Sequence, residues 1–303
     1  MTELSLLEST RTLLITGASS NIGSALIRQL LSFPGLKVRA MVHRSLVNVP
    51  GCEVRPGNLN NPGLMARALA GVDTVVHLAA LTKSRRESNY FNINVMGTEN
   101  LVNACVEQRV KKIVYISSRA ASLDGGGYAS SKLEAEEIVK KSGLQWAILR
   151  PSEVYSRGGE DSMNRLIRWI QKYPFVPVIG AGESKLSPVY IDDVVSAISL
   201  SIFDETLENE TLVLTGPEEL TYDELVDRIA AYFGVSRLKL YLPSELVQFT
   251  AKVLSSFGVD FLVPDQIPRL LCKKPYEINR VRAKLSYFPR HLEAGMKKML
   301  DQE

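Results

Sequence analysis

Residues 12–23 read TLLITGASSNIG, and this stretch decides the fold: an apolar run leads into Gly17, and Gly23 stands at the start of an amphipathic helix. A backbone that approaches a pyrophosphate needs a tight turn after a strand, free N–H groups at a helix start and no side chain where helix meets sheet. Gly17 and Gly23 meet the first and third needs. Asn21 stands near the place of a central glycine and tolerates a left-handed backbone well. The stretch predicts a phosphate-binding loop; a β-to-α turn with incidental glycines is the alternative.

The sequence around this loop alternates short apolar runs with longer helical patterns. Strands are expected at residues 12–16, 38–42, 53–55, 74–78, 113–117 and 146–149, and helices at 22–31, 62–70, 95–109 and 129–141. Helices long enough to cross over a sheet, placed between such strands, are typical of βαβ units. The first half therefore predicts an α/β fold of the Rossmann type, with a doubly wound parallel sheet.

The pattern changes beyond Pro151, where prolines and glycines interrupt the chain before helices expected at 193–203, 222–233 and 244–257. We expect residues 1–155 to form an NAD(P)-binding Rossmann domain, completed by parts of 185–215. Residues 156–303 are expected to form a smaller, mostly helical substrate-binding part.

The composition excludes several classes of protein. With 36 Lys and Arg against 33 Asp and Glu, the net charge is +3, and no run of like charges suggests nucleic-acid binding. The three cysteines and three histidines show no spacing typical of a metal site, and His77, inside an apolar strand, is expected to be a satisfied core residue. The N-terminal residues do not resemble a secretory signal, and residues 12–27, the longest uncharged stretch, are too short for a membrane span. We expect a cytoplasmic protein without a metal.

The choice between NAD and NADP depends on the residues about 20 positions after the glycine loop, where NAD-binding folds place a carboxylate on the ribose. Here that position is His43, followed by Arg44, and there is no carboxylate. An arginine can bind the 2′-phosphate of NADP through paired hydrogen bonds. NADP(H) is therefore favoured, while NAD(H) stays open if Arg44 is only a solvated loop residue.

Tyr128 and Lys132 form the only Y-x-x-x-K in the chain. At i and i+4 they share one face of a helix. A nearby ammonium favours the phenolate, which would bring the tyrosine closer to the pH at which it exchanges a proton with a carbonyl or carbinol. The spacing occurs often by chance, so its place after the strand at 113–117 gives it weight. We expect acid–base chemistry for hydride transfer here.

Several stretches together resemble the extended short-chain dehydrogenases/reductases, the NAD(P)-dependent epimerase/dehydratase superfamily. They are TGASSNIG at 16–23, GNLNNP at 57–62, DTVVHLAA at 73–80, NVMGTENL at 94–101, ISS at 116–118, YASSK at 128–132 and LRPSEVY at 149–155. Within the superfamily the chain most resembles the atypical branch of the respiratory complex I accessory subunit and its bacterial relatives. That likeness rests on VRAMVHR at 38–44, PVIGAGESKLSPVYIDDVVSAI at 177–198 and YFPRHLEAGM at 287–296.

The resemblance implies a cofactor-binding role for a set of loop residues. Those around the pyrophosphate would be Gly17, Ser19, Ser20, Asn21, Ile22 and Gly23. His43 and Arg44 would lie at the adenosine ribose, and Asn58 and Leu59 near the adenine, with Asn58 in place of the family's usual aspartate.

At the other end of the cofactor, the resemblance implies that Leu78, Ala79 and Ala80 line the nicotinamide ribose. Tyr128 and Lys132 would bind its other side, and Pro151 and Val154 would touch the nicotinamide. Ser117 is included in the predicted cofactor site.

The sequence departs from the family where a substrate would react. Arg119 stands where sugar-nucleotide epimerases carry a catalytic Ser or Thr, and only residues 119–127 separate Ser118 from Tyr128. Ser118 is our candidate for the catalytic hydroxyl, with Ser117 and Ser122 as alternatives. Equally, Ser117 and Ser118 could end a strand and form only local hydrogen bonds.

The favoured function is an NADP-dependent oxidoreductase or epimerase-like enzyme with a small-molecule substrate, for which a nucleotide sugar is a candidate. The alternative is a catalytically weak or inactive NADP(H)-binding protein with a structural, assembly or sensing role. Arg119 and the short loop favour the alternative, and Tyr128 with Lys132 favours the enzyme. By analogy with the superfamily, a homodimer through the helices at 95–109 and 129–141 is expected.

Overall fold

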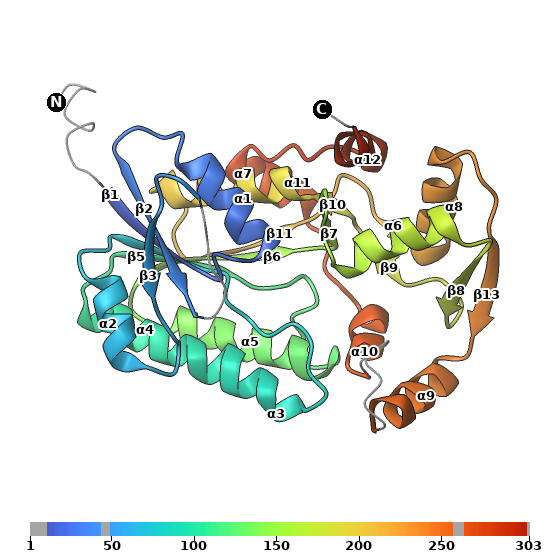
Figure 1. Ribbon diagram of the computed structural model, residues 1–303, viewed down its shortest axis with the longest axis horizontal. Helices are drawn as coiled ribbons and strands as arrows, with labels where there is room; N and C mark the ends of the chain where they lie inside the picture. Colours follow the sequence, from blue (N-terminus) through green and yellow to red (C-terminus); the bar gives the residue numbers. More distant parts are fainter. Residues whose placement is uncertain (1–10, 44–48, 257–263, 302–303) are drawn as a thin grey trace.

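The centre of the protein is a seven-stranded parallel sheet, seen in a computed structural model that describes residues 11–43, 49–256 and 264–301 (Figure 1). Its strands are β1 (Arg11–Thr16), β2 (Leu36–Val42), β3 (Glu53–Pro56), β4 (Thr74–His77), β5 (Lys112–Ile116), β6 (Gln145–Pro151) and β11 (Glu210–Leu214). They are ordered β11-β6-β5-β4-β1-β2-β3, and every pair is parallel. The winding reverses between β1 and β4, the point at which such sheets bind ligands. The predicted doubly wound sheet is confirmed.

Helices cover both faces of this sheet (Figure 1). One face carries α1 (Asn21–Leu30), α7 (Ile191–Phe203) and α11 (Ile278–Leu285); the other carries α2 (Pro62–Leu69), α4 (Gly97–Glu107) and α5 (Gly126–Lys140). In β1, Leu13 and Ile15 pack in the core on the α1 side, whereas Leu14 packs in the core on the α2 side. A strand buried on both faces needs apolar residues at successive positions, which explains the continuous run in TLLIT.

The outermost strand β11 comes from far along the chain. It pairs with β6 so that Glu210 lies opposite Ala147 and Leu214 opposite Pro151. The helix α7, which precedes it, packs against α1. Residues beyond 190 therefore contribute to the same sheet as residues 11–151.

The remaining elements form a smaller part beside the sheet (Figure 1). They are β7 (Val154–Tyr155), α6 (Ser162–Lys172), β8 (Phe175–Ile179), β9 (Lys185–Leu186), β10 (Val189–Tyr190), β12 (Leu220–Thr221), α8 (Tyr222–Tyr232), β13 (Leu238–Leu242), α9 (Ser244–Ser256), α10 (Gln266–Leu271) and α12 (Leu292–Leu300). The strands pair as β7 with β10, β8 with β13 and β9 with β12. A short helix α3 (Glu87–Tyr90) and a π-helix η2 (Phe91–Met96) precede α4. Helices are the longer elements of the smaller part.

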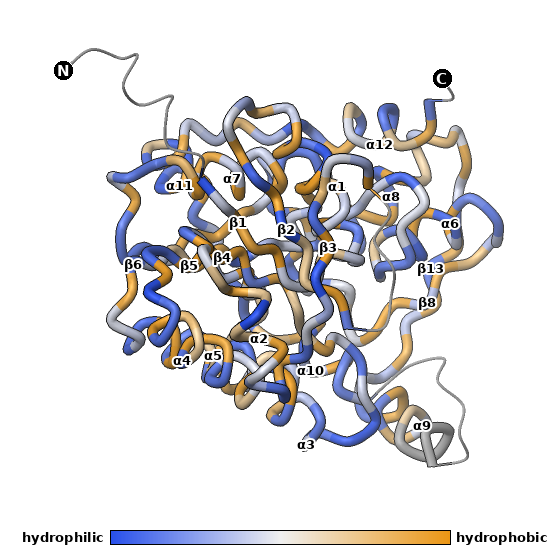
Figure 2. The backbone as a smooth tube through the Cα atoms, turned by 60° about the vertical axis from the view of Figure 1, so that its left-hand side comes forward, coloured by the Kyte–Doolittle hydropathy of each residue, from blue (hydrophilic) through white to orange (hydrophobic). Residues whose placement is uncertain are grey.

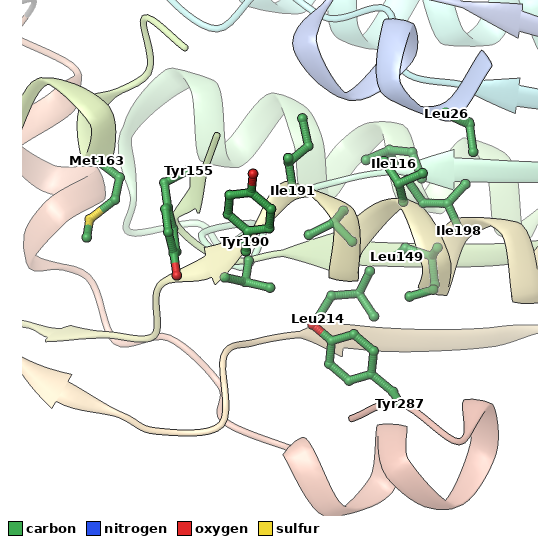
Figure 3. Packing of buried hydrophobic residues seen from close by; sticks show 14 of the residues in the cluster. Leu26, Ile116, Leu149, Tyr155, Met163, Tyr190, Ile191, Ile198, Leu214 and Tyr287 are labelled. Atoms are coloured by element: carbon green, nitrogen blue, oxygen red, sulfur yellow. The ribbon is translucent and has the colours of Figure 1, made fainter. Parts of the chain in front are cut away.

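One hydrophobic core connects the two parts (Figure 3). Figure 2 shows hydrophobic residues along the strands of the central sheet. The rings of Tyr155 and Tyr190 meet edge to face, with centroids 5.5 Å apart. Met163 of α6 and Leu149 of β6 belong to the same buried cluster. Such continuous packing favours a fixed arrangement of the two parts. Within the described residues, no helix has the length and hydropathy of a membrane span.

Candidate active site

The loop between β1 and α1 has no room for a side chain at either glycine. Gly17 has a φ of 66°, and a Cβ on it would lie 2.6 Å from the backbone nitrogen of Ala79. A Cβ on Gly23 would lie 2.5 Å from the carbonyl oxygen of Gly17. The first glycine thus permits both the turn and the close approach of the segment after β4, and the second permits α1 to pack against the loop.

The start of α1 fits an anionic ligand. Ser20 is the N-cap, and its side chain accepts a hydrogen bond from the N–H of Gly23 at 3.0 Å. The first turn of α1 contains no acidic residue, so the positive end of the helix dipole is not neutralised there. The donor groups of this loop therefore suit a pyrophosphate.

The expectation that Asn21 supplies a left-handed turn is wrong. Asn21 is the first residue of α1, and the left-handed residue of the loop is Gly17. Among the described residues, positive φ values outside glycine occur at Arg109, Asn209 and Ser286. The turn is complete before the helix begins, so no second left-handed residue is needed.

Two residues expected at the adenosine lie side by side. The amide nitrogen Nδ2 of Asn58 is 3.2 Å from Nε2 of His43, and Oδ1 of Asn58 accepts the N–H of Asn60 at 2.9 Å. The carbonyl of Leu59 accepts a hydrogen bond from the side chain of Asn100 on α4 at 3.0 Å. Arg44 lies outside the described residues. His43 and Asn58, 15 residues apart in sequence, thus meet next to the end of β2.

Buried hydrogen bonds fix the segment after β4. Nδ1 of His77 is 2.7 Å from Oγ1 of Thr16, and Nε2 is 3.0 Å from Oγ1 of Thr98. Oγ1 of Thr16 also accepts the N–H of Ala79 at 3.2 Å. Burial lowers the pKa of His77 to about 3, so the ring stays neutral and bridges β1, β4 and α4. The prediction of a satisfied core histidine is confirmed, and its bonds hold residues 78–80.

Asn94 extends this network, and sequence reasoning did not assign it to the site. It is 1% exposed and lies in the π-helix η2. Its Oδ1 accepts the N–H of Leu81 at 2.7 Å, and its Nδ2 donates to Oγ of Ser131 at 2.9 Å. Asn94 thereby connects the segment after β4 to α5. The signal was its place in the stretch NVMGTENL, but that pattern does not reveal a π-turn.

Tyr128 and Lys132 lie on α5 beside the carboxyl end of β5. Tyr128 is 8% exposed, and its ring meets the ring of Tyr90 edge to face. Nζ of Lys132 donates to the carbonyl oxygen of Ile116 at 2.8 Å and lies 4.1 Å from the centre of the Tyr115 ring. Burial lowers the pKa of Lys132 to about 7. The ammonium is thus directed at the end of β5.

The surroundings of the Tyr128 phenol differ from the expectation. Burial raises its pKa, and the groups that lower it are first Arg269 and then the nearby hydroxyl of Ser118. The sequence predicted that Lys132 would act in this way. Lys132 does not lower the pKa of Tyr128 here, because its amine is hydrogen-bonded to the carbonyl of Ile116.

The two adjacent serines have different surroundings. Ser117 donates to Oε1 of Glu136 at 2.5 Å, and Glu136 is fully buried and bound by Nε and Nη2 of Arg150 at 2.8 and 2.6 Å. The hydroxyl of Ser117 therefore joins β5 to α5. Ser118 accepts the N–H of Ala120 at 3.2 Å and also faces Tyr128. Only the second serine has a geometry that suits a substrate oxygen.

Arg119 belongs to a group of charges in which the cations are buried and the carboxylates are half-buried. Its Nε donates to the carbonyl oxygen of Pro275 at 2.7 Å, its Nη2 pairs with Glu219, and its Nη1 is 3.7 Å from Oε2 of Glu153. Lys274 binds the other oxygen of Glu153 at 3.1 Å. Burial by itself would raise the pKa of Glu153, but the positive charges of Lys274 and Arg119 lower this pKa to about 2. We call Arg119, Glu153, Glu219 and Lys274 the junction cluster, because they join the end of β5 to the smaller part.

Pro151 and Val154 lie close by, at the end of β6 and in β7. The carbonyl of Pro151 accepts the N–H of Arg119 at 2.9 Å, and Val154 lies opposite Val189 of β10. The described residues expected around the nicotinamide and pyrophosphate thus follow the carboxyl ends of β1, β4, β5 and β6, which meet at one edge of the sheet.

The helix α10 brings two charged residues onto Tyr128 that sequence reasoning did not identify. Cζ of Arg269 lies 4.7 Å from the centre of the Tyr128 ring, and Oδ1 of Asp265 accepts the N–H of Tyr128 at 3.2 Å. A cavity of about 230 Å³ is lined by Asp265 together with Glu87 and Tyr90. No sequence pattern links residues 137 positions apart. Within the described residues, no group of three or more His, Cys, Asp or Glu side chains could hold a metal ion.

The protein has a parallel sheet with a glycine loop after β1. It also has a Tyr and a Lys four residues apart on the helix after β5. These features are typical of a Rossmann-type dinucleotide-binding protein. Comparison with known families makes this specific. Residues 13–213 match the model of the NAD dependent epimerase/dehydratase family. The chain therefore belongs to this family.

Curated relatives are distant in sequence. A 3beta-hydroxysteroid-dehydrogenase/decarboxylase (isoform 2) of Arabidopsis thaliana is 24% identical over 80% of this chain and 50% of its own length. The chain therefore spans half of that relative, and it spans 65% of isoform 1. The UDP-glucose 4-epimerase of Vibrio cholerae is 23% identical over 95% of this chain and 94% of its own length. The structure also resembles a UDP-glucuronic acid 4-epimerase from Bacillus cereus, with a TM-score of 0.75, 21% identity and coverage of 94% and 96%. At this identity the structural likeness supports the fold.

Proposed function

We propose that this protein is a nicotinamide-dependent oxidoreductase or epimerase-like enzyme, in which a hydride passes between the nicotinamide and a carbonyl or carbinol carbon of a small substrate. The observation that carries the proposal is the buried Tyr128 with the half-buried Ser118 near its phenol, both placed at the edge of the sheet where the glycine loop also lies. Family membership supports it.

The roles follow from the contacts of each side chain. When bound, the nicotinamide supplies or accepts the hydride. The phenol of Tyr128 would give a proton to the substrate oxygen in reduction and take it back in oxidation. Ser118, whose hydroxyl lowers the pKa of that phenol, would orient the same oxygen. Lys132, held by the carbonyl of Ile116, would bind ribose hydroxyls. Residues 17–23 would hold the pyrophosphate.

For the cofactor we favour NADP(H). The residue that follows β2 is His43, which leaves no carboxylate to repel a 2′-phosphate at that position, and Arg44 comes next in the sequence. The family's description names NAD, so NAD(H) is the competing ligand. A fluorescence titration with NADPH and NADH decides between them, with Arg44→Ala expected to weaken NADPH more than NADH.

Two substrate classes are supported by the relatives, which include hydroxysteroid dehydrogenases and UDP-sugar epimerases. We propose that one of these two classes, a nucleotide sugar or a hydroxysteroid, supplies the reacting carbinol. Product analysis after incubation with UDP-glucose and with a 3β-hydroxysteroid, each with both oxidised nucleotides, separates them.

A second function is favoured by the junction cluster. Arg119 lies at the position of the family's catalytic Ser or Thr and is committed to Glu219 and Pro275. This supports a protein that binds NADP(H) for a structural, assembly or sensing role, as the likeness to the complex I accessory-subunit branch also suggested. Such a protein would bind nucleotide tightly and turn over neither substrate.

The substitution Tyr128→Phe distinguishes these functions. For an enzyme we expect turnover to fall by about 10²-fold or more, because the proton donor is lost, with nucleotide affinity nearly unchanged. Steady-state kinetics and the nucleotide titration measure the two effects. Tight nucleotide binding without turnover by the unaltered protein would favour the second function, and full turnover by Tyr128→Phe would contradict the assignment of Tyr128.

The homodimer remains a prediction. The helices α4 and α5 lie side by side on one face of the molecule, and η2 and α4 expose Ile93, Met96 and Val106 (Figure 1). These residues would be covered in a dimer built from the two helices. Light scattering during size-exclusion chromatography gives the mass.

A further inference from the structure

The segment around α10 contacts Tyr128 at two points and the neighbouring loop at a third. Asp265 accepts the N–H of Tyr128, the guanidinium of Arg269 lies over the ring, and Nη1 of Arg269 donates to the carbonyl oxygen of Thr82 at 3.4 Å. Thr82 belongs to the segment after β4. The smaller part thus contacts the candidate acid–base residue and the loop next to it with one short element.

The sequence before Tyr128 is shaped for this contact. Gly126 has a φ of 85°, and a Cβ on it would lie 2.7 Å from Oδ1 of Asp265 and 3.1 Å from Cγ of Pro268. Any other residue at Gly126 would therefore push α10 away from the start of α5. The run of three glycines at 125–127 has a structural use that the sequence alone did not indicate.

Arg269 is the cation that faces the ring of Tyr128. Lys132, four residues along α5, is turned to the carbonyl of Ile116 and to the ring of Tyr115. Asp265, an acid in the same segment, accepts a hydrogen bond from the backbone of Tyr128. It raises the pKa of the phenol, whereas Arg269 lowers it. A guanidinium over an aromatic face is attracted to the ring, and more strongly when the phenol has lost its proton.

We propose that Arg269 is a positioning residue for Tyr128: its guanidinium fixes the ring and supplies the positive charge that favours the phenolate, so that the acid–base group is complete only when α10 lies against α5. This inference rests on the proposed function for its catalytic meaning. Its physical content, the effect of Arg269 on Tyr128, holds whatever the substrate is.

The test measures the ionisation of Tyr128 directly. Phenolate absorbance is recorded immediately after a rapid jump to each of a series of high pH values, before the chain unfolds, and the same series with Tyr128→Phe is subtracted. Each variant is measured in the full-length protein with its own Tyr128→Phe partner. The variants are Arg269→Met, Arg269→Lys and, as a matched control on an exposed arginine of α11, Arg280→Met.

We expect Arg269→Met to raise the pKa of Tyr128 by about 0.5 to 1 unit. The free energy that corresponds to such a shift is similar to that of a cation–π contact. Arg269→Lys should restore part of the shift, and Arg280→Met should leave the titration unchanged. If Arg269 served only to keep α10 in place, its loss would expose Tyr128, and since burial raises this pKa the titration would move to lower pH instead.

An unchanged or lowered titration in Arg269→Met overturns the proposal. Failure of the proposed function is seen separately, as absence of turnover in the unaltered protein, and leaves this titration readable. With an active substrate, Arg269→Met should lower kcat at neutral pH and shift the pH profile upward while nucleotide affinity stays within about twofold.

Discussion

Gly17 is the residue on which the nucleotide loop most directly depends. It has a left-handed backbone and also lies against the backbone of Ala79, so that it joins the ends of β1 and β4. Either property alone would disfavour a side chain. Together they place the strand ends close enough for a dinucleotide to contact both.

Replacing Gly17 tests whether both properties count. Gly71 has a similar φ of 70° but no atom within 4 Å of an added Cβ, so Gly71→Ala should lose only the backbone preference, about 1 kcal/mol. Gly17→Ala should lose about 1–3 kcal/mol more, because the chain must shift to relieve the contact with Ala79. Urea denaturation measures both variants. Equal losses would show that the contact with Ala79 is not tight.

At the residue scale, spacing identified the right side chains but not all of their contacts. The pair Tyr128 and Lys132 was found because i and i+4 share a helix face. Which carbonyl Lys132 binds depends on where β5 ends relative to α5, and no pattern in the sequence states that. Ser117 and Ser118 look alike in sequence, but directly after β5 the first hydroxyl binds Glu136 and the second lies near Tyr128.

The π-helix η2 joins the segment after β4 to α5. Its extra residue per turn places Asn94 where the amide reaches both the segment after β4 and α5. The element therefore transmits the position of α5 to residues 78–81.

Asn94→Ala should lower the free energy of unfolding by about 1–3 kcal/mol, since buried partners at Leu81 and Ser131 lose their hydrogen bonds. It should also weaken nucleotide binding, because the segment after β4 is released. Asn103→Ala, on the exposed face of α4, is the matched control and should change stability by less than about 0.5 kcal/mol. Urea denaturation and nucleotide titration supply the two readouts; equal behaviour of the two variants would exclude the role of Asn94.

At the element scale, the strands of the central sheet in residues 11–151 and the helices between them were predicted from their apolar runs and periodicity, whereas the short α3 and the π-helix η2 were not. The outer strand β11 was harder to place, since its partner β6 is far away in sequence. The position of α10 was beyond prediction for the same reason: residues 265–269 meet Tyr128 across 137 positions.

At the scale of the whole molecule, the junction cluster links the sheet to the smaller part. Two cations and two carboxylates lie between the ends of β5 and β6 and the segments at Glu219 and Lys274. Buried charges of this kind are stable as a set and costly to break individually. The family resemblance predicted that Arg119 departs from the usual chemistry. The partners of Arg119 could not be predicted, because they come from three separate segments.

Glu153→Gln should lower the free energy of unfolding by about 3–5 kcal/mol near neutral pH, because the buried cations Arg119 and Lys274 lose a charged partner. The folded pKa of Glu153, about 2, is below its ordinary value of 4.5, so its stabilisation is fully present above pH 4.5 and is lost as the pH falls toward 2. The difference between the two proteins should shrink across that range. Urea denaturation at several pH values tests this, with the exposed Glu205→Gln as control. A difference independent of pH would contradict the role of the charge.

The place of β11 at the margin of the sheet has a consequence for biogenesis. Residues 152–209 are made after β6 and before the strand that covers it. During synthesis β6 therefore presents a row of unpaired N–H and C=O groups, a surface to which other strands readily add. The edge of β6 is therefore the part of the sheet most open to wrong pairing until residues 210–214 have been made.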